Sequence, residues 1–242
     1  MGSASGSLTP YKRRRPVPAL VLFAVLLVSS VFVWVKVLGN ASDVDAAIKC
    51  NVPGNVATTT SAVAGADPAG ATSTAPPPAL GTVLEHDALD RTNPVPVGEV
   101  NFKVVNASTQ RNHAKAVATM FTELGLKQAA DPGNDLVYPA GDMNCRGQIR
   151  FGAPGASAAR TLSLLEPCLE LVRDDRQDAT LDIAIGKKFD EVKPNSDARK
   201  VLDQLKEWAE QQPEQQGGQV AAAAPPTLSA DNLAGARDVT CS

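Results

Sequence analysis

The sequence predicts an α/β fold: a two-layer β-α-β-β-α-β sandwich carried on a single N-terminal transmembrane helix, with a disordered linker. An uncharged apolar run occupies residues 17–35. A stretch rich in Ala, Thr, Gly and Pro covers residues 53–97. Between residues 98 and 190, apolar residues alternate with polar ones in some segments and recur at helical spacing in others.

The apolar run is predicted to be a membrane anchor. Residues 17–35 leave no polar face, and their number is close to the roughly 20 residues that cross the hydrocarbon core. Four basic residues, 12–15, precede the run, whereas only Lys36 follows it closely. The positive-inside bias therefore predicts a cytoplasmic tail at residues 1–16 and a single-pass plasma-membrane protein whose C-terminal part is extracytoplasmic.

A cleaved signal peptide is the rival interpretation of this run. Gly39 and Ala41 satisfy a small-residue cleavage rule. The run is longer than the usual signal-peptide core of roughly 7–15 residues, which favours the uncleaved anchor.

The segments between anchor and domain differ in composition. Residues 36–52 form a membrane-proximal segment with a short helical pattern. Residues 53–97 contain too few large apolar side chains to offset the entropy of ordering. We interpret them as a disordered linker that carries the domain away from the membrane.

The first half of the domain is predicted to be a strand followed by a helix. Val100, Phe102 and Val104 alternate with polar residues, as in a half-buried strand. Ser108 or Thr109 is expected to cap the helix that follows. Its apolar stripe comprises Ala114, Val117, Ala118, Phe121 and Leu124. A short strand near 126–129 follows.

The second half repeats the strand and helix pattern. Ile149 and Phe151 mark a strand, and Pro167 is expected to end or kink the next helix. Residues 169–172 are a candidate extra edge strand, and residues 181–185 form the last strand. Phe121 and Ile183 should therefore be buried on facing elements. Residues 191–242 are predicted to hold an amphipathic helix capped by Asn195 or Ser196 and a C-terminal tail.

Four cysteines, Cys50, Cys145, Cys168 and Cys241, all follow the anchor. An even number in an exported chain indicates two disulfides, for which three connectivities exist. Because the strand after Cys145 and the helix before Cys168 are neighbours in the predicted order, we expect a Cys145–Cys168 bond. Cys50–Cys241 would then be the second pair.

Composition excludes several classes of function. Setting aside the five basic residues around the apolar run leaves 18 of the 23, against 26 acidic ones, a balance of −8. That balance argues against a nucleic-acid partner. His86 and His113 do not suffice for a three-ligand zinc site, no C-x-x-C motif is present, and we expect no cofactor.

Candidate ligand-binding residues lie at two places. Asn106 and Ser108 sit where a strand meets a helix, a place suited to an anion, although plain helix capping is the simpler interpretation. Arg146 and Arg150 flank a strand and have the charge to grip an acidic glycan, although a solvated face is the simpler one. No catalytic residue is predicted.

The order of these motifs resembles the LytR C-terminal domain over residues 99–189. The resemblance rests on the strand and turn at 100–108, the helix ending at 124–126, and the segments 149–152, 158–162 and 181–186. The anchor, the linker, and the segments 43–50 and 236–241 extend it to actinobacterial cell-envelope proteins with this domain. Ala107 departs from the more usual glycine.

The resemblance implies a non-enzymatic envelope module that binds a wall polymer or another envelope protein. The LytR-CpsA-Psr catalytic domain has no counterpart here, so its transferase activity is not implied. Two alternatives are an accessory subunit of a glycopolymer-attaching enzyme and, less favoured, a wall hydrolase, which would need a carboxylate pair such as Glu166 and Glu170.

Overall fold

The computed structural model describes residues 17–54, 79–211 and 226–241, in two compact units, Met1–Asp43 and Val44–Ser242. The predicted tail at residues 1–16 and part of the predicted linker, 55–78, lie outside the described residues.

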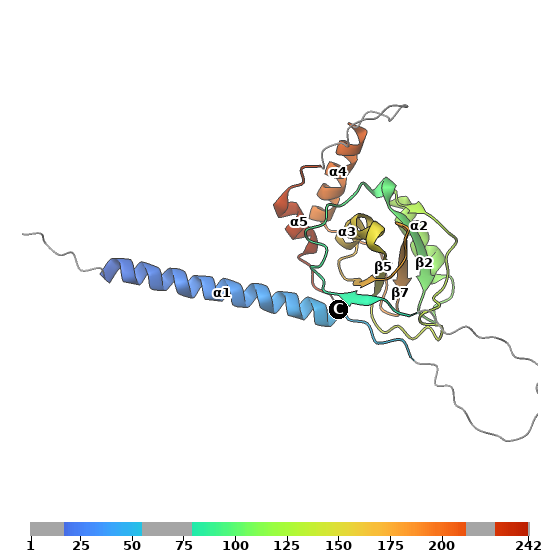
Figure 1. Cartoon of the computed structure of the whole chain (residues 1–242), viewed down its shortest axis with the longest axis horizontal. Coiled ribbons are helices and arrows are strands. Elements are labelled where there is room, and N and C mark those ends of the chain that lie inside the picture. The colour runs from blue at the N-terminus through green and yellow to red at the C-terminus, as the bar shows by residue number, and fades with distance from the viewer. Residues whose placement is uncertain (1–16, 55–78, 212–225, 242) are drawn as a thin grey trace, which may run out of the picture. The chain divides into compact units, whose positions relative to one another are not determined.

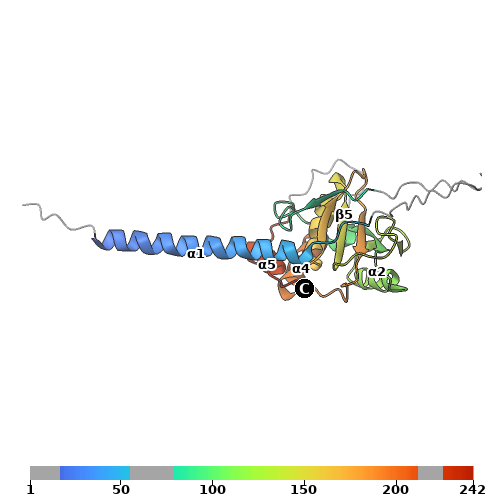
Figure 2. The same cartoon turned by 90° about the horizontal axis from the view of Figure 1, so that it is seen from below.

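In the first unit the structure describes residues 17–43 of helix α1 (Val17–Ile48), and the last five residues of α1, 44–48, belong to the second unit. Figure 1 and Figure 2 both show α1 as one uninterrupted helix. Its large apolar side chains that the structure describes, from Val21 to Trp34, are exposed. Judged on the described residues, no helix has the length and apolar character required to cross a membrane. The spanning role of residues 17–35 stays a prediction.

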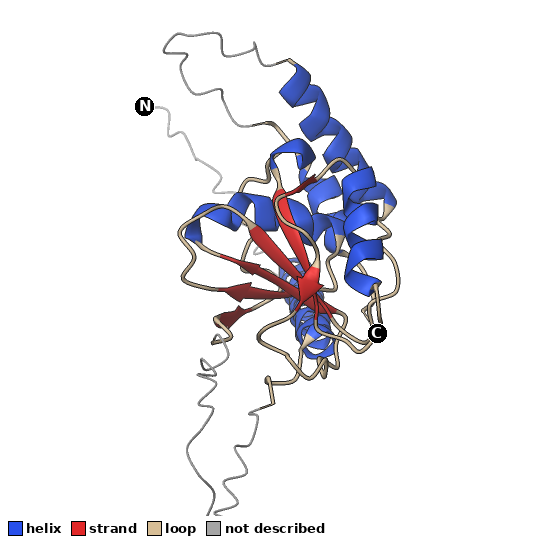
Figure 3. Cartoon of the chain, turned by 90° about the vertical axis from the view of Figure 1, so that its right-hand side faces the viewer, coloured by secondary structure: helices blue, strands red, loops and turns tan. Residues whose placement is uncertain are grey.

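The second unit is built on a mixed sheet of seven strands, whose twist is visible in Figure 3. Its strands are β1 (Thr82–Leu84), β2 (Asn101–Asn106), β3 (Lys127–Gln128), β4 (Gly133–Asn134), β5 (Gly147–Phe151), β6 (Glu170–Arg173) and β7 (Leu181–Ile185). The order across the sheet is β1-β6-β5-β7-β2-β3, and β4 also pairs with β2. The pairs β2–β7 and β5–β6 are parallel, whereas β5–β7 and β1–β6 are antiparallel.

Two helices cover one face of this sheet, α2 (His113–Glu123) and α3 (Ala156–Leu165). The rings of Phe102 on β2 and Phe121 on α2 meet edge to face, with centroids 5.7 Å apart. Phe121 and Ile183 are both completely buried in the same core. The α/β class and the facing positions of these residues, predicted from apolar spacing alone, are confirmed.

The predicted strand order differs from the observed one in two ways. The candidate extra edge strand exists as β6, but it is not at the edge, because it lies between β1 and β5 in the sheet. Strand β1 was not predicted, because it falls in the segment taken as disordered linker. Residues 79–97 are instead folded onto the domain: Leu89 is buried, and β1 pairs with β6, which would otherwise be a bare edge. Gly81 permits this pairing, since a Cβ there would lie 2.1 Å from the Arg173 carbonyl oxygen.

The start of α2 also differs from the prediction. The helix begins at His113, and its N-cap is Asn112, which has a left-handed φ of 58°. Asn is among the few residues that adopt this conformation readily. Ser108 and Thr109 are therefore not helix caps.

The C-terminal part packs on the domain. Helix α4 (Ser196–Glu210) is capped by Asn195, as predicted, and α5 (Ala230–Arg237) follows the undescribed residues 212–225. A separate apolar cluster joins Leu164 of α3 to these two helices. The predicted amphipathic helix is confirmed, and the stretch predicted as a C-terminal tail contains α5, which packs on the domain.

The predicted disulfide pairing is wrong. The bonds join Cys50 to Cys145 and Cys168 to Cys241, with Cα–Cα distances of 4.9 and 5.5 Å. The prediction failed because it treated both flanking segments as loose. Ile48 and Cys50 are instead buried against the sheet, and α5 returns the C-terminus to the turn that holds Cys168.

Peptide mapping under non-reducing conditions checks this pairing directly. We expect one disulfide-linked peptide containing Cys50 and Cys145 and another containing Cys168 and Cys241, both lost after reduction and alkylation. Because the Cα separations of both pairs lie within the ~4.4–6.8 Å that a disulfide requires, no rearrangement is needed. A peptide joining Cys145 to Cys168 would contradict the structure.

Candidate functional site

The turn at the end of β2 is held by its own polar side chains. The Asn106 Oδ1 atom accepts hydrogen bonds from the Ser108 backbone N–H, at 3.0 Å, and from the Ser108 hydroxyl, at 2.8 Å. The Asn106 amide donates to the Gln110 carbonyl at 2.7 Å, and the Ser108 hydroxyl accepts from the Gln110 N–H. The polar atoms of the two predicted ligand-binding residues are thus used to shape the turn.

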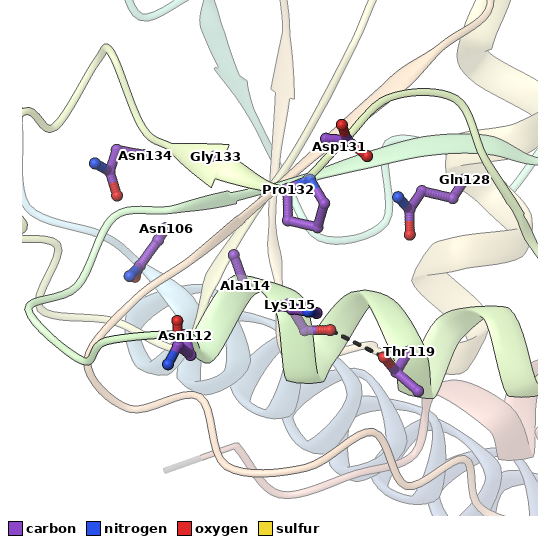
Figure 4. A pocket seen from close by; sticks show the side chains of 10 residues that line it. All are labelled: Asn106, Asn112, Ala114, Lys115, Thr119, Gln128, Asp131, Pro132, Gly133 and Asn134. Atoms are coloured by element: carbon purple, nitrogen blue, oxygen red, sulfur yellow. Dashed lines mark hydrogen bonds between the residues drawn. The ribbon is translucent and has the colours of Figure 1, made fainter.

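Beside this turn lies a groove of about 490 Å³ between α2 and the short strands β3 and β4 (Figure 4). Its α2 side carries Asn112 and Lys115, and its strand side carries Gln128, Asp131 and Asn134. Asn106 lies on its rim. The volume is within the range of roughly 300–1,000 Å³ that small-ligand sites occupy.

The sheet face opposite α2 and α3 carries a buried polar network centred on Arg150. Its guanidinium makes a bidentate pair with Asp135, at 2.9 and 2.6 Å, and its Nε donates to Gln148. Gln148 in turn donates to Glu170, which also accepts from the Cys50 backbone N–H. Arg150 is only 5% exposed, so this network is part of the core.

Apolar side chains and coil seal this network from water. Val137, Tyr138 and Met143 are buried over the same face, next to the Cys50–Cys145 bond. The Tyr138 hydroxyl donates to the Asn51 carbonyl at 2.5 Å. Burial raises the pKa of Tyr138 to about 12, although the nearby Arg150 opposes that shift.

Arg146 also has internal partners. Its guanidinium donates to the Glu166 carboxylate at 3.1 Å and to Asp190 and the Glu191 carbonyl, and it lies 4.8 Å from the centroid of the Phe189 ring. Ligand binding by Arg146 or Arg150 would require one of these pairs to open. Of the four predicted binding residues, only Asn106 borders the groove.

The two carboxylates considered for hydrolysis belong to separate networks. Glu166 bonds to Arg146 and to the Lys193 N–H, whereas Glu170 bonds to Gln148 and Cys50. Burial raises the pKa of both groups above the ordinary value for glutamate. Each carboxylate therefore serves an internal hydrogen-bond network.

His86 and His113 are both partly buried. The His86 ring lies 3.1 Å from the Pro167 carbonyl, and the His113 ring stacks edge to face on Phe189. Burial lowers the pKa of both rings. Within the described part of the chain, no three His, Cys, Asp or Glu side chains are grouped to hold a metal ion.

Sequence reasoning missed Asp135, Gln148 and the groove side chains. A signal for Gln148 and Arg150 was present, because both alternate with Ile149 and Phe151 and so share the second face of β5. No comparable pattern marks Gln128 or Asn134.

Known proteins share sequence features with this chain. A family model described as LytR cell envelope-related transcriptional attenuator matches residues 99–189. The cell envelope integrity protein Cei of Mycobacterium tuberculosis is 32% identical over 200 residues, which cover 83% of this chain and 85% of that protein. The chain belongs to the Cei family. The resemblance read from the sequence motifs is confirmed.

A solved structure is similar to this chain in fold and in sequence. The soluble domain of a secreted protein from Mycobacterium marinum matches with a TM-score of 0.55 and 31% identity, over 67% of this chain and 99% of that chain. Both relatives are thus described as envelope or secreted proteins.

The Arg150–Asp135 pair is testable by a double-mutant cycle. Arg150→Met leaves Asp135 buried without its partner, which should lower the free energy of unfolding by about 3–5 kcal/mol. The double variant Arg150→Met with Asp135→Leu should lower the free energy of unfolding by less than the sum of the two single changes. Urea denaturation of the four proteins measures this, with the exposed Lys187→Met as control. Additive single effects would contradict the pairing.

Tyr138 should ionise well above an ordinary tyrosine. Its folded pKa is raised to about 12 from an unfolded value of about 10, so its contribution to stability is complete below pH 10 and is lost as the pH rises through about 12. An ultraviolet absorbance titration should show a phenolate step well above pH 10, and Tyr138→Phe should remove it. A single step near pH 10 in the parent protein would contradict this assignment.

Proposed function

We propose that this chain is a membrane-anchored, extracytoplasmic module that supports cell-envelope integrity by binding a wall polymer or another envelope protein, without catalysis. The observation that carries the proposal is the match to Cei along 85% of that protein's length. The match extends well beyond the 99–189 segment, so the flanking segments are shared as well as the domain.

The proposed topology places residues 1–16 in the cytoplasm and the folded unit outside it. The basic cluster at 12–15 and the exposed apolar side chains along α1 support an anchor at residues 17–35. Two disulfides in the folded unit support an oxidising, extracytoplasmic compartment.

A contrast between two sets of polar groups supports a binding role. Arg146, Arg150, Glu166 and Glu170 are buried or half-buried and paired with one another or with neighbouring groups. Such groups stabilise a scaffold. The groove beside α2, by contrast, is open and polar.

An accessory subunit of a glycopolymer-attaching enzyme is the second candidate. It is favoured by the family match at 99–189, because that module is described by its relation to LytR. Under this proposal the chain would contribute binding in trans to an enzyme that carries the catalytic domain.

Retention on fractionated envelope material tests the proposal. The detergent-solubilised full chain, incubated separately with purified wall and with solubilised envelope proteins, should be retained by one of them without releasing soluble fragments from the wall. The same chain after reduction and heating is the control. Retention on a glycopolymer-attaching enzyme alone would favour the second candidate. Failure to bind either fraction would overturn the binding role, and release of wall fragments would show a hydrolase.

A further inference from the structure

Carboxamides are the commonest side chains among those lining the groove beside α2. Four of the lining side chains, Asn106, Asn112, Gln128 and Asn134, are of this kind, each with two N–H donors and one carbonyl acceptor. None of the ten described lining residues carries an aromatic ring or a large aliphatic side chain. The groove therefore lacks the surface that would hold an acyl chain or stack against a sugar ring.

Most of these polar groups have no partner inside the protein. Among the described residues, the side chains of Asn112, Lys115, Gln128 and Asn134 accept or donate no hydrogen bond and form no ion pair, whereas Asn106 uses all its polar atoms in the β2 turn. In Figure 4 the only bond drawn between lining residues joins Thr119 to the Lys115 main chain. These groups are free to meet a ligand.

The strand side of the groove is an open sheet edge. In the parallel ladder with β2, the Lys127 and Ala129 N–H groups donate to Val100 and Phe102, so the main-chain groups of Gln128 between them point away from the sheet. The Asp135 N–H likewise donates to Asn106, so those of Asn134 point outward. An extended chain could bond to these main-chain groups.

The charges and the length of the groove restrict the ligand further. Lys115 on α2 and Asp131 on the opposite side give one charge of each sign, which suits a ligand of no net charge and disfavours a polyanion. From Asn112 to Thr119, α2 rises about 10 Å. This is the length of about three extended residues.

We propose that this groove binds a short extended peptide segment through its amide groups, a step that rests on the proposed binding function and names the ligand class. Peptide bonds present the donor and acceptor pairs that carboxamides and a free sheet edge recognise. Such a segment could come from a wall cross-link or from an envelope protein, and both offer the same chemistry.

Equilibrium dialysis of the detergent-solubilised full chain with three probes tests the proposal. The capped tripeptide N-acetyl-Ala-Ala-Ala-amide should bind at one site per chain, whereas chitotriose and tripolyphosphate should not bind. Gln128→Ala and Asn134→Ala should each weaken peptide binding about fivefold, equivalent to one neutral hydrogen bond. Gln177 is exposed and lies outside the groove, so Gln177→Ala should leave peptide binding unchanged. Circular dichroism of each variant verifies folding.

The outcomes separate this inference from the proposed function. Three results would each overturn the peptide site. They are no peptide binding at millimolar concentration, peptide binding by the groove variants equal to that of the parent chain, and a preference for chitotriose or tripolyphosphate. If the chain is still retained on envelope fractions, the binding function stands and lies elsewhere on the surface. Displacement of the bound tripeptide by peptides from digested wall, or by solubilised envelope proteins, identifies the source of the segment.

Discussion

The buried ion pair between Arg150 and Asp135 is the constraint on which the second face of the sheet depends. A charge inside the fold costs several kcal/mol unless it is paired and fully hydrogen-bonded. Strand β5 turns Arg150 toward that face because Ile149 and Phe151 fill the other. The chain must therefore bring a carboxylate across the sheet, and the segment that begins at Asp135 does so. The apolar residues that follow it then exclude water from the pair.

The sequence predicted those parts of the fold whose signal is local. Phe102, Phe121 and Ile183 were placed correctly, because alternation and helical spacing are properties of a few consecutive residues. Ser108 was misplaced as a helix cap because a competing acceptor, the Asn106 side chain two residues earlier, takes its hydrogen bonds. The disulfide pairing was missed because it depends on where Cys50 and α5 dock, and no local pattern encodes docking.

The same distinction explains what could be predicted of the candidate site. Asn106 was found because it ends a clear strand. Gln128 and Asn134 were not found, because their positions depend on the pairing of β3 and β4 with β2. Each of these strands has only two residues, which is too short for a periodic pattern to predict. The two sides of the domain also divide their polar groups differently. The network around Arg150 satisfies its own donors and acceptors, whereas three of the four carboxamides lining the groove are unpaired, so the groove is the better place to look for a ligand.

The Cys50–Cys145 bond changes what the segment between Cys50 and β1 does mechanically. Only Lys49 separates the end of α1 from Cys50, and that cysteine is covalently fixed to the folded unit. A pulling force on α1 would pass through the disulfide into the domain and would bypass residues 51–81. Lengthening or shortening that segment would leave the attachment point unchanged. Reduction of that bond would leave residues 51–81 as the only covalent connection between Cys50 and the rest of the folded unit.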